Sequence, residues 1–83
     1  MNKIKCNNVK YRQGYLEITP NIHDGLINIE SWDIDPKVDI TPLDISSEDF
    51  PCEAICGNTE LELSLDDARE LVRALEAAIK TLA

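Results

Sequence analysis

The sequence predicts a small α+β domain, an antiparallel sheet of three to four strands packed by one C-terminal amphipathic helix. Two observations predict this class. Polar and apolar residues alternate in several short stretches, as they do in half-buried strands, and apolar residues near the C-terminus recur with a helical period. The 83 residues are enough for a single domain, 1–83, with a thin core.

The expected strands cover residues 4–6, 11–19, 26–34 and 59–65. The first is a weak pattern. The second and third are separated by a loop that ends in Asp24-Gly25, which suggests a hairpin. Gly57-Asn58 is a turn signal before the last strand. Apolar residues two apart should share a face: Leu16 with Ile18, Ile27 with Ile29, and Leu61 with Leu63 and Leu65.

The helix is expected over residues 65–82. Ser64 suits the N-cap, and Asp67 stands where the acid of a capping box would stand. We expect the apolar stripe of this helix to be buried in the core. Its members are Ala68, Leu71, Val72, Leu75, Ala78, Ile79 and Leu82.

Residues 35–53 show neither the helical period nor the alternation of a strand. They hold three prolines and six acids, and they form a connection longer than most loops of compact domains. Residues 38–40 are a candidate edge strand, because proline disfavours a central one. Residues 46–49 are a candidate single helical turn.

The net charge of −8 is unevenly distributed. Residues 1–14 carry four bases and no acid, whereas residues 15–64 carry twelve acids and only Lys37. Such an acidic surface repels phosphate backbones, so direct nucleic-acid binding is not expected, apart from a local exception at the basic N-terminal stretch. A basic protein partner is the better electrostatic match.

No stretch is apolar for the ~18 residues that a membrane span needs. The N-terminus has no apolar core of a signal peptide, so we expect a cytoplasmic protein with reduced thiols and no membrane partner. The oligomeric state is left open between monomer and homodimer.

No catalytic apparatus is evident, and we expect neither an enzyme nor a cofactor. Cys6, His23, Cys52 and Cys56 could form a zinc set, in which Cys52 and Cys56 have a permitted spacing but Cys6 and His23 are not a local pair. Cys52 with Cys56 could form a redox pair, but the pair lacks the C-x-x-C spacing. The favoured interpretation is that the cysteines are small buried hydrophobes and that His23 is a solvated turn residue.

These features favour a small acidic protein-binding or inhibitor module, such as a phage-encoded inhibitor of host defence or a nucleic-acid mimic. The alternatives are an immunity protein against a nuclease toxin and an accessory domain whose acidity serves solubility. The acidic stretch 32–53 is the expected partner-binding surface, with aromatic rings as anchors unless they belong to the core. The second candidate surface is the strand face with Glu60 and Glu62. The expected partner-binding residues are Trp32, Asp33, Asp35, Asp39, Asp44, Glu48, Asp49 and Phe50.

Overall fold

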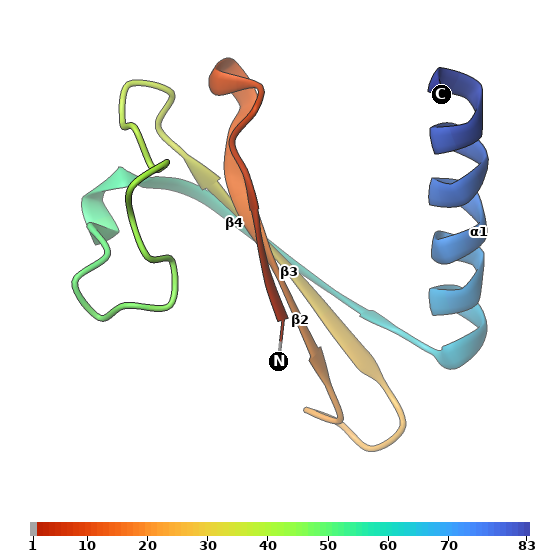
Figure 1. Ribbon diagram of the computed structural model, residues 1–83. Coiled ribbons are helices and arrows are strands. Elements are labelled where there is room, and N and C mark those ends of the chain that lie inside the picture. Colours follow the sequence, from red (N-terminus) through yellow and green to blue (C-terminus); the bar gives the residue numbers. More distant parts are fainter. Residues whose placement is uncertain (1) are drawn as a thin grey trace.

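A computed structural model describes residues 2–83 as one four-stranded antiparallel sheet followed by a single helix (Figure 1). This confirms the predicted α+β class. The strands are β1 (Asn2–Cys6), β2 (Gly14–Pro20), β3 (Ile27–Ile34) and β4 (Ile55–Leu63), and the helix is α1 (Leu65–Leu82). Two short 3-10 helices, η1 (Lys10–Arg12) and η2 (Cys52–Ala54), precede β2 and β4.

The strands follow one another in space in their sequence order, β1-β2-β3-β4. A loop of residues 21–26 joins β2 to β3, closed by the Asn21 N–H donating to the Leu26 carbonyl at 2.9 Å. This is the expected hairpin. The last strand is longer than predicted, because Gly57 and Asn58 pair with β3 instead of forming a turn. The second strand is shorter, because η1 takes up its first residues.

The two faces of the sheet differ in composition, since successive side chains of a strand point to opposite sides. One face, here called the open apolar face, gathers the aliphatic residues that alternation predicted to share a face within each strand, and it adds Ile4 of β1. Its aliphatic residues are Ile4, Leu16, Ile18, Ile27, Ile29, Leu61 and Leu63. Leu65, which was expected to continue the group of the last strand, is instead the first residue of the helix. The opposite face, here called the covered face, carries Tyr15, Trp32 and Ile34 at one end and charged residues at the other.

The core lies at the aromatic end of the covered face, beneath the connection between β3 and β4. This connection, residues 35–54, is here called the covering segment. Its Ile40 is 0% exposed and packs with Tyr15, Ile34 and Ala54. Trp32, Val38, Leu43, Ile45, Phe50 and Ile55 surround these four residues as half-buried neighbours.

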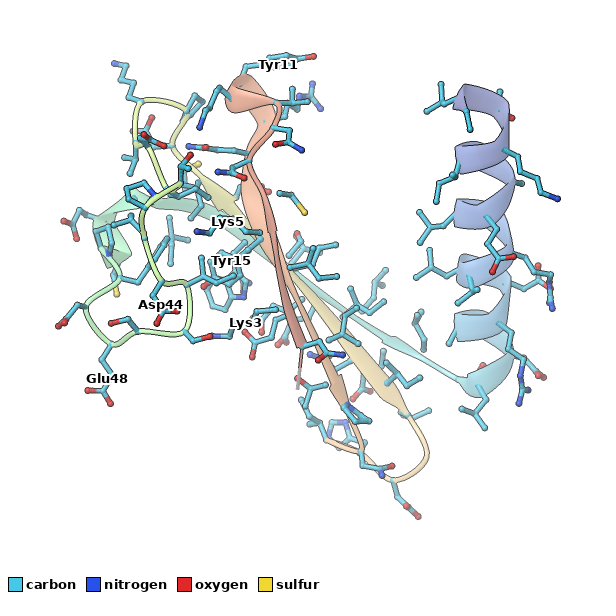
Figure 2. All side chains as sticks on the ribbon, viewed as in Figure 1. Lys3, Lys5, Tyr11, Tyr15, Asp44 and Glu48 are labelled. Atoms are coloured by element: carbon cyan, nitrogen blue, oxygen red, sulfur yellow. The ribbon has the colours of Figure 1, made fainter. Side chains whose placement is uncertain are left out.

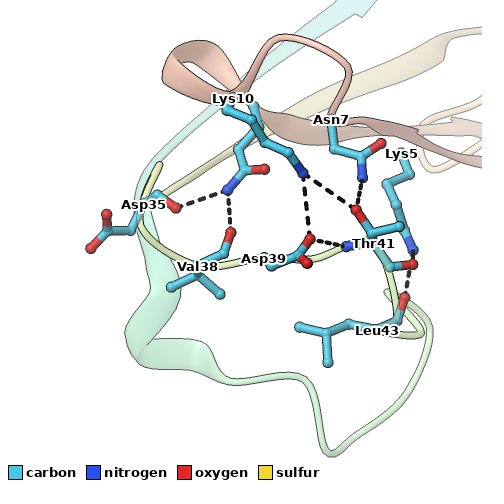
Figure 3. Close-up of polar contacts among 9 residues, drawn as sticks. Lys5, Asn7, Lys10, Asp35, Val38, Asp39, Thr41 and Leu43 are labelled. Carbon is cyan, nitrogen blue, oxygen red and sulfur yellow. Dashed lines mark hydrogen bonds and ion pairs between the residues drawn. The ribbon is translucent and has the colours of Figure 1, made fainter.

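The covering segment is fastened to the N-terminal third of the chain by polar side chains (Figure 3). The buried Gln13 amide donates to the carbonyls of Asp35 and Val38, at 2.9 and 2.5 Å. The Lys5 ammonium, from β1, donates to the carbonyls of Thr41 and Leu43, at 3.2 and 2.6 Å. The segment therefore holds a defined shape over the sheet without strands of its own.

Neither local element considered for this segment forms. Residues 38–40 are not a strand, and residues 46–49 are turns, not a helix. The physical reason is local competition: the carboxylates of Asp35, Asp39 and Asp44 each accept a backbone N–H two residues further on. Such Asx turns bend the chain and withhold its N–H groups from a ladder.

The helix begins and ends where the sequence predicted, but its stripe is not buried. The Ser64 side chain accepts from the Asp67 N–H, and the Asp67 carboxylate accepts from the Ser64 N–H, so the capping box is formed. Yet no residue of α1 is buried, and Leu82 is 88% exposed. The prediction of a buried stripe is wrong for the single chain, because the helix meets the sheet only near the end of β4.

Candidate acidic binding surface

Three glutamates lie side by side across the covered face. Glu17 of β2 is directly opposite Glu30 of β3, and Glu30 is directly opposite Glu60 of β4. We call these three residues the glutamate row. Like charges that oppose each other across strands destabilise a sheet, so the row is an unfavourable arrangement for folding alone.

Few cations compensate the row. Within residues 2–83, its one ion pair is at the β1 end, where the Lys3 ammonium is 4.0 Å from the Glu17 carboxylate. Glu30 instead accepts a 2.9 Å hydrogen bond from the Asn58 amide. Glu62, the next residue of β4 on this face, pairs with His23 of the hairpin turn. The Glu60 carboxylate is exposed, so the row faces solvent at its β4 end.

The row separates two hollows of the covered face. One, of about 340 Å³, lies under the covering segment and is lined by Tyr15, Trp32, Phe50 and Glu48 among others. The other, of about 290 Å³, lies at the hairpin end and is lined by Ile22, His23, Asn28, Glu60 and Glu62. Glu60 of the row lines the second hollow, and Lys3, which pairs with Glu17, lines the first.

The first hollow contains stacked rings. The Tyr15 ring stacks on Trp32 with centroids 5.8 Å apart, and Phe50 meets Tyr15 edge-on at the same distance. The Lys3 ammonium lies 5.8 Å from the centre of the Tyr15 ring and donates to the Ile45 carbonyl (Figure 2). This site already accommodates a cation from its own chain, beside both an aromatic face and a carboxylate.

The electrostatic effect of the row extends to Tyr15. Burial raises the pKa of the Tyr15 phenol above its ordinary value, and the negative charges of Glu17 and Glu30 raise this pKa further. The pKa of Tyr15 is therefore higher in the folded protein than in the unfolded chain. The contribution of Tyr15 to the free energy of unfolding is fully present below the unfolded pKa and is lost as pH rises through the folded pKa.

Titration of Tyr15 tests this arrangement. In a Tyr11→Phe background, Tyr15 is the sole tyrosine, and its tyrosinate absorbance should appear above the usual pH for this residue. Adding Glu17→Gln should lower the midpoint, since a nearby negative charge is removed. The matched change Glu76→Gln, on α1, should leave it unchanged. A titration midpoint that does not change with Glu17→Gln would contradict the proposed electrostatic effect of the glutamate row on Tyr15.

The expected partner-binding residues do not form one surface. Trp32 and Phe50 pack on Tyr15 at the edge of the core. Asp33 lies on the open face of the sheet, against Gly57. Glu48 and Asp49 are exposed on the covering segment. Trp32, Phe50 and Glu48 nevertheless line the same hollow. The role of the set in partner binding stays a prediction.

The other three acids of that set hold turns. The carboxylates of Asp35 and Asp44 accept backbone N–H groups at 2.9 Å. Hydrogen bonds from the backbone and then the side chain of Thr41 lower the pKa of Asp39, and Lys10 adds to this effect. These carboxylates stabilise the shape of the covering segment. Their hydrogen bonds within the chain use part of the acceptor capacity that a partner would need.

The basic N-terminal stretch is used within the chain. Lys3, Lys5 and Lys10 all donate to the covering segment, the last through Asp39 and Thr41. Each hydrogen bond takes up part of the donor capacity that a phosphate backbone would require. Arg12 is not among these donors, and the local exception made for nucleic acid at this stretch stays a prediction.

The cysteines differ from expectation in their environment. Cys6, Cys52 and Cys56 are free thiols, and all three are exposed, not buried as small hydrophobes. Among residues 2–83, no three Cys, His, Asp or Glu side chains are close enough together to hold a metal ion. His23 is exposed in its turn, as expected, but its ring pairs with Glu62.

Sequence reasoning identified Glu60 and Glu62 as one exposed strand face, and it missed Glu17 and Glu30. Alternation places each of these two on a polar face, but only the strand register brings them opposite each other. Within the described part of the chain, no helix is long and apolar enough to cross a membrane. The chain matches no family model, no curated protein and no solved structure in the comparisons made with each.

Proposed function

We propose that this protein is an acidic inhibitor module, which binds a basic protein partner through the glutamate row and the hollows beside it. The observation that carries the proposal is the row itself: Glu17, Glu30 and Glu60 oppose one another across three strands with one lysine to compensate them. Like charges that oppose each other are unfavourable for folding, whereas an approaching cation is attracted by all three charges.

The chemistry of the surface favours arginine and lysine side chains. Carboxylates take guanidinium groups in charge-assisted hydrogen bonds, and aromatic faces such as those of Tyr15 and Trp32 attract cations. Adjacent strands are ~4.8 Å apart, so the row presents negative charges in a regular line. A protein that normally binds nucleic acid offers the complementary surface, and this favours inhibition by charge mimicry.

Binding of a labelled arginine-glycine peptide tests the location of the surface. Three double variants each remove two negative charges: Glu30→Gln with Glu60→Gln, Glu48→Gln with Asp49→Asn, and Glu70→Gln with Glu76→Gln. The first should weaken binding by roughly 5- to 30-fold, since each lost charge pair contributes up to ~1 kcal/mol. The third, on α1, should change binding less than about twofold, since at moderate salt its charges are screened from the distant site.

The readouts are peptide anisotropy and the fluorescence of Trp32, the only tryptophan. Wild-type affinity should fall as salt rises, because the attraction is screened over ~10 Å at 0.1 M. Equal weakening in all three variants would mean that net charge alone attracts the peptide, and the proposal would be wrong. The largest loss in the second variant would move the surface to the covering segment.

One substitution of the first double variant, taken alone, carries a prediction for stability. Replacing Glu30 with Gln removes two like-charge contacts and keeps an acceptor for the Asn58 amide. We expect the free energy of unfolding to rise by roughly 0.2–1 kcal/mol. Urea denaturation followed by circular dichroism measures this change. A loss of stability would show that the row is a structural feature and not a binding one.

A further inference from the structure

The helix α1 presents an apolar stripe that the described chain does not cover. Its large aliphatic side chains are between 40 and 88% exposed, and its polar side forms internal pairs such as Arg69 with Asp66. An amphipathic helix of a globular protein normally turns such a stripe to a core. The exposed members are Leu65, Leu71, Val72, Leu75, Ile79 and Leu82.

The open apolar face of the sheet is uncovered as well. Ile4 is 47% exposed and Leu61 is 65% exposed, although both lie on the aliphatic side of the sheet. Asp33 is the only charged residue that the register places on this face. The helix stands on the same side of the sheet, with carbon-only side chains projecting toward it (Figures 1 and 2).

The chain exposes more area than a compact monomer of its size. The chain exposes 6293 Å², whereas a compact monomer of 9.3 kDa exposes about 5,000 Å². Its radius of gyration is 14.2 Å, against about 12 Å for a compact chain of this length. The excess area, roughly 1,300 Å², exceeds the ~800 Å² per partner that a stable protein–protein interface buries.

The junction between β4 and α1 keeps the helix away from its own sheet. It consists of Ser64 alone, whose N–H, side chain and carbonyl all take part in helix-capping hydrogen bonds, with Asp67 and Ala68. Turning α1 about the backbone of Ser64 would break this capping box. The capping box therefore favours the observed direction of the helix, which leaves the stripe available to another chain.

We propose that a second copy of this chain covers both surfaces, with α1 of each copy packed on the open apolar face of the other. The arrangement is isologous, because the stripe of one chain meets the face of its partner and the reverse contact is identical. Both surfaces come from the same chain in equal number, so a two-fold pair leaves neither uncovered. The acidic groups of the covered face lie on the opposite side of each sheet and stay clear of the interface.

Sedimentation of the full chain tests the proposal. Between about 1 and 100 µM we expect twice the chain mass of 9.3 kDa. Leu75→Glu in the stripe and Leu61→Glu on the face should each raise the dissociation constant at least 100-fold. Ala77→Glu adds the same charge to the polar side of α1 and should leave the dimer intact. A wild-type chain that remains monomeric at the highest concentration would overturn the proposal.

Mixing Leu75→Glu with Leu61→Glu distinguishes the proposed dimer, in which each helix packs on the sheet of the other chain, from other modes of pairing. A mixed dimer keeps one intact contact, between the helix of Leu61→Glu and the face of Leu75→Glu, so mixing should restore dimers that neither variant forms alone. Absence of restoration, or equal disruption by Ala77→Glu, would refute the exchanged arrangement. Trp32 fluorescence, which reports the separate core under the covering segment, checks that each variant is folded.

Discussion

Replacing Ile40 with Ala is expected to lower the free energy of unfolding by about 2–5 kcal/mol, because lost transfer energy and a new cavity add together. Ile40 is 0% exposed, and it is the residue through which the covering segment reaches the core. Domains of this size have a stability of a few kcal/mol. The substitution should therefore leave the protein close to its folding threshold. Thermal and urea unfolding, followed by Trp32 fluorescence, measure the loss.

Ile22 is the matched control for this substitution. It is the same residue type, but it lies in the hairpin turn and is 54% exposed. Ile22→Ala should change the free energy of unfolding by less than about 0.5 kcal/mol. Similar losses at the two positions would mean that the core does not lie beneath the covering segment.

Replacing Gly14 with Ala should also be strongly destabilising, by about 1–3 kcal/mol or more. A Cβ atom at Gly14 would lie 2.2 Å from the backbone carbonyl oxygen of Trp32 on the neighbouring strand. Backbone atoms of β3 cannot move without disturbing the ladder on both of its sides. Urea denaturation of the variant, with circular dichroism to confirm that the sheet persists, gives the magnitude.

Gly57 provides the comparison for Gly14, since both pair with Asp33, from opposite sides of β3. A Cβ atom at Gly57 would lie 2.7 Å from the Asp33 carboxylate, which is the end of a flexible side chain and can rotate away. Gly57→Ala should therefore cost less than Gly14→Ala. The reverse order would contradict the close approach of β2 and β3 at this point.

The elements defined by local interactions were predictable from the sequence. The helix boundaries followed from the Ser64 cap and the period of the stripe, both of which depend on residues a few positions apart. Alternation likewise placed Leu16 with Ile18 on one sheet face. The interpretation of Gly57 as a turn residue was wrong, because glycine also occurs where two strands approach each other closely.

The site depends on contacts between distant residues, and for that reason much of it was not predictable. Glu17 and Glu30 become neighbours through the register of β2 with β3, which alternation alone does not define. The covering segment takes its shape from Gln13 and Lys5, more than twenty residues away. Burial of the helix stripe was predicted from periodicity, but periodicity does not say which chain provides the partner surface.

The sequential strand order has a consequence for folding kinetics. Each hairpin of the meander joins neighbours in the chain, so β1, β2 and β3 can assemble through short loop closures. The contacts of Lys3 with residue 45 and of Lys5 with residues 41 and 43 span nearly half the chain, and they require the longest closures near the core. We infer that β2 and β3 form the early folding nucleus, and that docking of residues 35–54 completes the native state.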